Sequence, residues 1–338
     1  MEKNLSTIKI NNPFVLAPMA GVTDRPFRTI CKSYGASLVY SEMISAKGMF
    51  YEDKNTDKLL LTSNFEQPLI YQIFGSEPDI IKFAVDALND RDNVAIDINM
   101  GCPVPKIVKN GEGSALMKNP DLIYDLIKAA KSVTDKPISA KIRLGWDKSS
   151  INGLEVASAI ESAGGDFIAI HGRTREQFYS GAANWEEISR IKRAITLPLI
   201  GNGDIYSGID GVNFLIKYGV DAVMIGQGAM GNPFIFKDLN NALSYYEKNG
   251  SLENYEPLQV SNSEKLTTLL KQFNLLVEEK GEYVAVRQIR SHGAWYLKGI
   301  HGASKTKQEL NKLQTADAIR AFIQIIITNS AAPISSHD

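Results

Sequence analysis

MIGQGAMGNP, residues 224–233, is the stretch that decides the fold of this 338-residue chain. It contains GQGAMG, which fits the G-x-G-x-x-G pattern of dinucleotide-binding folds at Gly226, Gly228 and Gly231. A true fingerprint follows the first strand of a βαβ unit and precedes further strands. The alternative is a phosphate site on another scaffold, so the surrounding sequence has to decide.

Eight short runs rich in β-branched residues recur along the chain, and GQG ends the last of them. Each run is nearly continuous in apolar character where it starts, as expected of parallel strands buried on both faces. Each becomes polar or glycine-rich where it ends. The predicted strands are FVLAPMA (14–20), LVYSEMI (38–44), LIYQIFG (69–75), AIDINMG (95–101), ISAKIRLG (138–145), FIAIHGR (167–173), PLIGNGDI (198–205) and AVMIGQG (222–228).

The segments between these runs carry helix signals. Asn119-Pro120 supplies a cap and a first-turn proline before DLIYDLIKAAKSV, and GIDGVNFLIKYG ends at Gly219. Eight such βα units predict a (β/α)8 TIM barrel, whose active sites lie at the C-terminal ends of the strands. A doubly wound sheet is the competing architecture.

The position of GQGAMG answers the opening question. It ends the eighth predicted strand and only helices follow, so no parallel sheet is left to complete a dinucleotide-binding unit. In barrels, the loops after strands seven and eight commonly bind phosphate through backbone N–H groups and a short helix N-terminus. GNGD (201–204) and GQG (226–228) supply these two loops, although each could instead be only a tight turn.

The chain changes character after the barrel. Residues 257–330 contain no strand-like run and read as four helices, the first introduced by the capping box Ser261-x-x-Glu264. The second predicted helix spans 282–300. We therefore predict a barrel domain over 1–245, an all-helical domain over 257–330 and a disordered tail over 331–338.

Charge and composition exclude several classes. The net charge is −1, so binding of nucleic acid would depend on a local patch. Residues 258–338 are slightly basic, with ten Lys and Arg against seven Asp and Glu. Cys31 and Cys102 have no metal-ligand spacing, and no apolar run is long enough to span a membrane. A reducing cytoplasm is the expected location.

Polar residues gather where the predicted strands end. Each alone could be structural, but together above a phosphate site they suit flavin mononucleotide (FMN), with amides for the ring edge and a lysine near N1. They are Pro18-Met19-Ala20-Gly21, Glu42, Gln72, Asn99 with Cys102, Lys141 with Arg143, His171 with Arg173, Asn202 with Asp204, and Gly226-Gln227.

Several motifs together resemble one enzyme family. The chain is similar to the tRNA-dihydrouridine synthases, most of all to the bacterial B-type enzymes, over nearly its whole length and in the family's order. NMGCP with APMAG separates this family from other flavin barrels. The matching stretches are APMAGVTDRPFR (17–28), QIFG (72–75), DINMGCPVPK (97–106), GSALMKNP (113–120), KIRLGWD (141–147), HGRTREQFYSGAANW (171–185), GNGDI (201–205) and WYLKG (295–299).

The resemblance implies an oxidoreductase that reduces particular uridines in tRNA to dihydrouridine. FMN would donate the hydride, and NADPH, with NADH as the alternative, would reduce the flavin again. Cys102 matches the catalytic acid. The positions similar to the family's FMN contacts are Pro18, Met19, Ala20, Gln72, Lys141, Asn202, Gly203, Asp204, Gly226 and Gln227, joined by His171.

The reaction explains why a cysteine is suited to this position. Hydride adds to C6 of the uracil ring, and C5 must then receive a proton from the opposite face. A thiol with a pKa near 8.5 is mostly protonated at pH 7 yet acidic enough to donate. Cys31 reads instead as a small buried hydrophobe. Asn99 either contacts the base or braces the loop.

tRNA is the only partner that the resemblance implies; no obligate protein partner, membrane or metal is expected. The target base must leave its stack to reach the flavin. Each basic candidate could instead lie on a solvated surface without contacting RNA. Trp295 and Tyr296 are predicted to pack in the core of the helical domain. The candidates are Asn99, Arg143, Arg173, Arg175, Arg287 and Arg290, together with Lys106, Lys109 and Lys298.

Two positions depart from the family pattern, and two rival functions stand beside it. Gln227 replaces a common arginine, so we expect weaker FMN binding, and Glu112 is expected to disfavour tRNA phosphates.

One rival is an FMN barrel acting on a small molecule, such as a dihydroorotate dehydrogenase or an ene-reductase. The other is a tRNA-binding folding helper with a vestigial flavin site. No motif fixes which uridine is modified.

Overall fold

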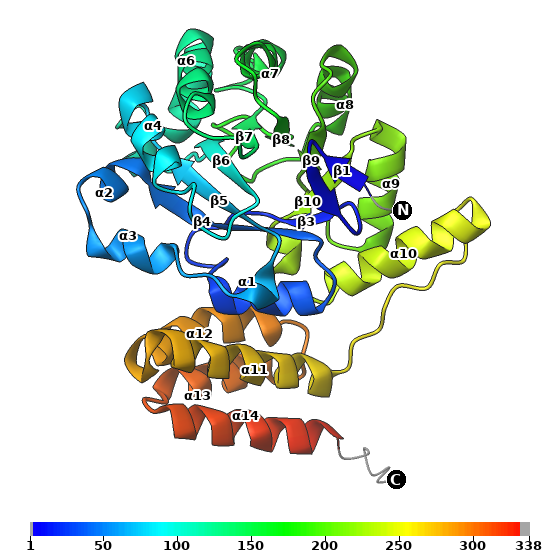
Figure 1. The fold of residues 1–338 in the computed structure, drawn as a ribbon. Helices are drawn as coiled ribbons and strands as arrows, with labels where there is room; N and C mark the ends of the chain where they lie inside the picture. Colours follow the sequence, from blue (N-terminus) through cyan, green and yellow to red (C-terminus); the bar gives the residue numbers. More distant parts are fainter. Residues whose placement is uncertain (1–2, 332–338) are drawn as a thin grey trace.

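Eight parallel strands close into a barrel in the computed structural model, which describes residues 3–331 (Figure 1). Every neighbouring pair is parallel, and β10 pairs with β3 to close the ring. The predicted (β/α)8 class is therefore confirmed, and an open doubly wound sheet is excluded. The strands are β3 (Phe14–Leu16), β4 (Leu38–Ser45), β5 (Leu69–Phe74), β6 (Ala95–Met100), β7 (Ile138–Arg143), β8 (Phe167–His171), β9 (Leu199–Asn202) and β10 (Ala222–Ile225).

Most of these strands are shorter than the runs that predicted them. β3 ends at Leu16, and β9 ends at Asn202. The polar and glycine-rich ends of the runs leave the sheet and form loops at the C-terminal rim. That rim is where a barrel places its functional groups.

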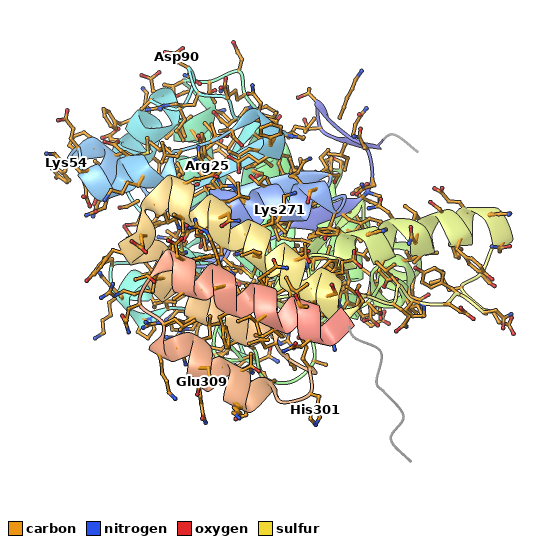
Figure 2. The ribbon with its side chains drawn as sticks, turned by 90° about the horizontal axis from the view of Figure 1, so that it is seen from below. Arg25, Lys54, Asp90, Lys271, His301 and Glu309 are labelled. Atoms are coloured by element: carbon orange, nitrogen blue, oxygen red, sulfur yellow. The ribbon has the colours of Figure 1, made fainter. Side chains whose placement is uncertain are left out.

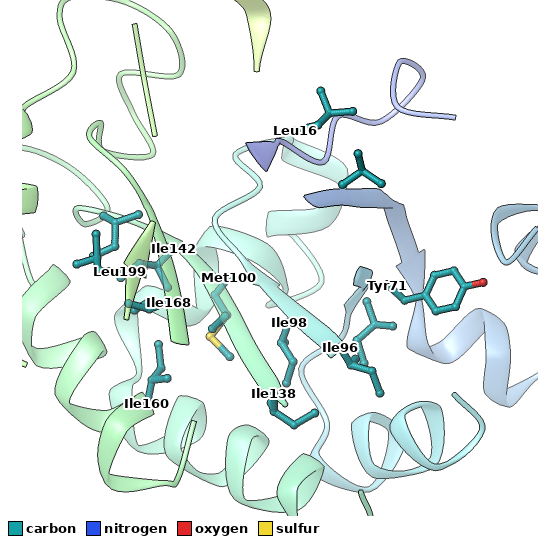
Figure 3. Packing of buried hydrophobic residues seen from close by; sticks show 14 of the residues in the cluster. Leu16, Tyr71, Ile96, Ile98, Met100, Ile138, Ile142, Ile160, Ile168 and Leu199 are labelled. Carbon is teal, nitrogen blue, oxygen red and sulfur yellow. The ribbon is translucent and has the colours of Figure 1, made fainter. Parts of the chain in front are cut away.

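Helices surround the barrel, and an apolar layer fills the space between helices and strands. Figure 3 shows part of this layer, including Ile98 and Met100 of β6 and Ile160 of α7. The expected caps are present: the Asn119 side chain accepts from Leu122 N, and Gly219 ends α9 in the left-handed region. The helices are α1 (Arg25–Ser33), α2 (Ala46–Phe50), α3 (Lys54–Leu59), α4 (Pro78–Asp86), α5 (Pro105–Val108), α6 (Pro120–Lys131), α7 (Gly153–Ser162), α8 (Trp185–Ala194), α9 (Gly208–Tyr218) and α10 (Ile235–Asn249).

An N-terminal hairpin that the sequence reading did not predict closes the other end of the barrel. β1 (Lys3–Leu5) pairs antiparallel with β2 (Ile8–Ile10). Leu5, Ile8 and Ile10 are buried in a cluster with residues at the starts of the strands, such as Phe167 of β8. The hairpin therefore seals the face opposite the functional rim.

Four helices follow the barrel, as expected, and share a core of their own. Ser261 caps the first of them, with its hydroxyl accepting from Glu264 N. Figure 2 views them from below, with Lys271 on α11 and His301 ahead of α13. They are α11 (Asn262–Lys280), α12 (Glu282–Tyr296), α13 (Ala303–Lys312) and α14 (Ala316–Ala331), with the short 3-10 turns η1 (Asn64–Glu66), η2 (Gly113–Lys118) and η3 (Gln227–Ala229) earlier in the chain.

Several predicted boundaries differ from the observed ones. α12 ends at Tyr296 rather than at residue 300, and α10 continues to Asn249, past the expected limit of the barrel domain at 245. Ala331 is the last residue of α14, and the rest of the predicted tail, 332–338, lies outside the described residues. None of the helices within 3–331 combines the length and apolar character that a membrane crossing requires.

Two of the C-terminal helices, α11 and α12, lie against α1 on one side of the barrel (Figure 1). Lys280 of α11 donates to Asp24 Oδ2 at 2.6 Å, and Gln288 of α12 donates to the same oxygen at 2.8 Å. Arg25 forms an ion pair with Glu279 at 2.6 Å. Polar contacts therefore join α11 and α12 to the start of α1.

Candidate active site

A cavity of about 380 Å³ opens at the C-terminal ends of the strands. Its volume lies within the range of small-molecule sites, about 300–1,000 Å³. Every predicted FMN contact lines it, as does Cys102. These are Pro18, Met19, Ala20, Gln72, Lys141, His171, Asn202, Gly203, Asp204, Gly226 and Gln227. The structure thus brings together residues that are up to about 210 positions apart in the chain.

The three glycines of GQGAMG have different structural roles. A Cβ on Gly226 would meet nothing closer than Ala17 Cβ at 3.7 Å, so backbone there is open to the cavity. A Cβ on Gly228 would lie 2.1 Å from the carbonyl oxygen of Ile205. One on Gly231 would lie 2.4 Å from the backbone of Trp295 in α12. Only the first glycine therefore faces the cavity freely; the other two are required by packing.

Lys141 places a cation in the cavity wall. Its Nζ donates to Asn202 Oδ1 at 3.1 Å, and Asn202 Nδ2 donates to the carbonyl of Met224 at 2.7 Å. Burial, with the nearby Arg143, lowers the pKa of Lys141 to about 8. The lysine therefore remains mostly charged at neutral pH, and an anionic ligand group beside it would raise its pKa again.

His171 is buried and neutral beside this cation. Burial, together with Lys141 and Arg143, lowers the pKa of His171 well below 6.5. Its Nε2 lies 3.3 Å from an Arg173 nitrogen. Because arginine can only donate, Nε2 accepts and the ring proton resides on Nδ1.

Arg173 is held inside the protein, which differs from the expected contact with an RNA backbone. The residue is only 5 % exposed. One guanidinium nitrogen binds Asp204 Oδ1 at 2.7 Å and Oδ2 at 2.9 Å. Asp204 also accepts from Ala183 N. The pair therefore fixes the loop after β9 at the cavity edge, and its charges largely cancel.

Arg143 also contacts backbone within the protein. It donates to the carbonyls of Gly101, Thr174 and Phe178 at 3.0, 2.8 and 2.8 Å. These bonds join the loop that carries Cys102 to the loop after β8. Arg143 lines the cavity, but its main observed contacts position these two loops.

The remaining basic candidates lie away from the cavity. Arg175 does not line it and stacks over Trp146, 4.7 Å from the ring centroid. On α12, Arg287 is exposed and lies 3.5 Å from the ring centroid of Tyr283. Arg290 donates to the carbonyl of Leu313 at 3.0 Å. Lys106, Lys109 and Lys298 are exposed, Tyr296 is buried in the helical core, and Trp295 packs at the junction with the barrel.

Cys102 lies at the cavity rim just after β6. Its N–H donates to Asn99 Oδ1 at 2.9 Å, and its carbonyl accepts from Ser114 N at 3.0 Å. Burial raises the pKa of the Cys102 thiol, partly opposed by Arg143 and Lys141. The thiol is therefore protonated at neutral pH, as a proton donor must be.

Asn99 shows the loop-bracing role that was one of its two expected roles. Its Oδ1 accepts from Gly101 N at 3.2 Å as well as from Cys102 N. Its Nδ2 donates to Gln72 Oε1 at 2.8 Å. Asn99 also lines the cavity, so contact with a base through its second N–H stays a prediction.

Asp97 was missed by the sequence reading. It lies on β6, is fully buried, and accepts from Gln72 Nε2 at 2.8 Å and from Ser139 Oγ at 2.6 Å. The signal was present in AIDINM, because a carboxylate in the middle of an apolar strand needs partners. Its partners on two other strands cannot be read from the sequence.

Glu112 is buried rather than displayed on the surface, and its effect on tRNA phosphates stays a prediction. It is 2 % exposed, and burial raises the pKa of its carboxyl, with Lys47 acting in the opposite direction.

Gln227 is exposed at the cavity edge, and Cys31 is fully buried in α1. Within residues 3–331, no cluster of His, Cys, Asp and Glu side chains could hold a metal ion.

Comparison with known proteins identifies the family. The family model described as dihydrouridine synthase (Dus) matches residues 15–332. The tRNA-dihydrouridine synthase B of Pseudomonas aeruginosa is 37% identical over 313 residues, covering 93% of this chain and 92% of that protein. The protein of the same name from Shewanella oneidensis is 37% identical over 309 residues, covering 91% and 93%.

A third relative supports the same family, and one solved structure shares the fold. The tRNA-dihydrouridine synthase B of Pasteurella multocida is 36% identical over 330 residues, covering 96% of each chain. Histamine dehydrogenase from Rhizobium sp. 4-9 aligns with a TM-score of 0.56 at 12% identity, covering 81% of this chain and 50% of that one, which supports the fold alone. The sequence relatives show more: this chain belongs to the dihydrouridine synthase family.

Proposed function

We propose that this protein reduces uridines in tRNA to 5,6-dihydrouridine, with FMN bound in the cavity and Cys102 as the proton donor. The observation that carries the proposal is the convergence of a protonated thiol, a buried lysine and two phosphate-type loops on one cavity. NADPH is the reductant we propose, with NADH as the alternative.

The cavity residues fit FMN. The open backbone at Gly226 suits a phosphate that approaches closely, and Gly203, with a φ of 128°, lines the same cavity. Lys141, which lines the cavity, would supply positive charge to a reduced flavin ring, which gains negative charge. Apolar wall comes from Ala17, Val22, Met43, Met224 and Met230.

The reaction divides between cofactor and protein. When bound, FMN supplies the hydride that adds to C6 of the uracil ring. Cys102 supplies the proton at C5, because its thiol is protonated and lines the same cavity. Arg143 and Asn99 hold the cysteine loop through Gly101 and the Cys102 amide, so the sulfur keeps its place when the base arrives.

We propose that α11–α14 form the tRNA-binding domain. The segment has a small excess of basic residues, and Arg287 with Tyr283 forms an exposed cation and ring pair on α12. Such a pair can contact phosphate and stack on a base. The first rival function, an FMN barrel acting on a small molecule, does not account for the family match. The experiment below distinguishes the proposed function from the second rival, a tRNA-binding folding helper.

The test uses Cys102→Ala with Cys31→Ala as its matched control. We expect Cys102→Ala to bind FMN and oxidise NADPH, yet reduce uridine at least ~100-fold more slowly, the usual size of a lost general acid. Cys31→Ala, which removes the thiol buried in α1, should keep uridine reduction. Dihydrouridine is measured in tRNA lacking modifications. Colourless wild-type protein that takes up no FMN would favour the folding helper, and unchanged turnover of Cys102→Ala would reject its role.

A further inference from the structure

A chain of hydrogen bonds runs from the buried Asp97 through residues of the cavity lining to the cysteine loop. Gln72 Nε2 donates to Asp97 Oδ2 at 2.8 Å, and Asn99 Nδ2 donates to Gln72 Oε1 at 2.8 Å. Cys102 N then donates to Asn99 Oδ1 at 2.9 Å. The chain thus crosses from one buried carboxylate, through two side-chain amides, to the residue that we assign as the acid.

The chemistry of its two ends sets the direction of this chain. An ionised carboxylate only accepts hydrogen bonds, and a backbone N–H only donates. Between Asp97 and Cys102 N, two amides form an unbroken chain in one orientation only. Gln72 must turn its nitrogen to Asp97, and Asn99 must turn its oxygen to Cys102.

We propose that Asp97 is a positioning residue, whose carboxylate fixes the orientation of Gln72 and Asn99 so that both amides present N–H donors to the cavity. Each NH₂ group makes one of these bonds and keeps a second hydrogen, for which the described residues give no partner. Both residues line the cavity. Resting on the proposed function, we assign these donors to carbonyl groups of FMN and of the uracil ring.

The surroundings keep Asp97 an acceptor. Burial raises its pKa to about 6, while hydrogen bonds from Ser139 and Gln72 and the charge of Lys141 act in the opposite direction. Tyr40 is the other titratable group beside it, and burial raises the pKa of that phenol well above 10. Asp97 is therefore mostly ionised at neutral pH. Since burying a carboxylate is costly, packing alone does not account for it.

The first experiment compares Asp97→Asn with Asp97→Leu, two substitutions of similar size. Asparagine keeps an oxygen that can accept from Gln72, whereas leucine leaves that amide free to turn its oxygen to the cavity. We expect Asp97→Leu to raise the FMN dissociation constant on the order of ten-fold over Asp97→Asn, since one donor is lost. Equal FMN affinity in two folded variants would overturn the proposal.

A second experiment applies if Asp97→Leu does not fold. Asn99→Asp places a carboxylate at each end of Gln72, which has a donor at one end only, so we expect a lower unfolding temperature. Asp97→Asn in the same chain lets Gln72 turn round and donate to the carboxylate introduced at position 99, and should restore most of that loss. A double variant no more stable than Asn99→Asp refutes the proposal.

These readouts separate this proposal from the proposed function. FMN affinity and unfolding temperature are measured on the full-length protein without tRNA. Wild-type protein that binds FMN but leaves tRNA uridines intact would contradict the function while the Asp97 comparison stands. The unfolding cycle of Asn99→Asp needs neither FMN nor tRNA.

Discussion

Gly231→Ala is the substitution that best tests how the two parts of the molecule fit together. Gly231 has a φ of +65°, and an added Cβ would lie 2.4 Å from Trp295 C and 2.6 Å from Tyr296 N. Both are backbone atoms at the end of α12, so no side chain can rotate away. Either α12 or the loop after β10 must move.

Gly219→Ala is a matched control that separates backbone strain from this clash. Gly219 also has a φ of +65°, but nothing lies within 4 Å of its added Cβ. Strain alone should cost about 1–2 kcal/mol, the penalty of the left-handed region for a residue with a Cβ. Overpacking adds about 1–3 kcal/mol more. We therefore expect losses of about 1–2 kcal/mol for Gly219→Ala and about 2–5 kcal/mol for Gly231→Ala.

Urea unfolding followed by circular dichroism gives both values, and binding assays show where the damage lies. Gly231 contacts α12, whereas Gly226 faces the cavity, so Gly231→Ala should weaken tRNA binding more than FMN binding. Equal stability losses in the two variants would show that the close approach of α12 does not require glycine, and would refute this reasoning.

Two further predictions concern titratable groups. Lys141→Met should weaken FMN binding about ten-fold or more. Because the lysine loses its charge as pH rises through its pKa of about 8, wild-type FMN affinity should fall between pH 7 and 9; an equal fall in the variant would contradict this. Burial lowers the pKa of His292 to about 4 in the folded protein, from about 6.5 in the unfolded chain. The folded state is therefore fully stable with respect to this group above pH 6.5, and it loses roughly 3 kcal/mol of unfolding free energy as pH falls toward 4. Urea unfolding at pH 7 and 4.5 should show a smaller acid loss for His292→Gln than for wild type, and an equal loss would argue against it.

The barrel could be predicted because its signal is repeated along the chain. Eight apolar runs alternate with capped helices, and a single misread run would not change the conclusion. The hairpin β1–β2 escaped because its strands have three residues each, too few to show a period. Most observed strands also end earlier than the predicted ones, since the last residues of a run leave the sheet to form the rim.

The cavity could be predicted because strand ends converge in a barrel, but the partners of each charge could not. Arg173 reads as an RNA contact until Asp204, 31 positions later, is placed beside it. Glu112 reads as a surface charge until the fold buries it. The sequence reports which side chains reach the rim, whereas their neighbours depend on how eight loops pack against one another.

The loops that form the cavity are also those that fix the helical domain. Gly226 lines the cavity while Gly231, five residues later, abuts α12. The loop 17–24 lines the cavity through Met19 and is tied to α11 by Asp24 and Lys280. If tRNA lies on α11–α14, as we propose, its position relative to Cys102 is set by these contacts rather than by a flexible linker. We therefore expect the choice of uridine to depend on the distance and direction between the RNA surface and the thiol.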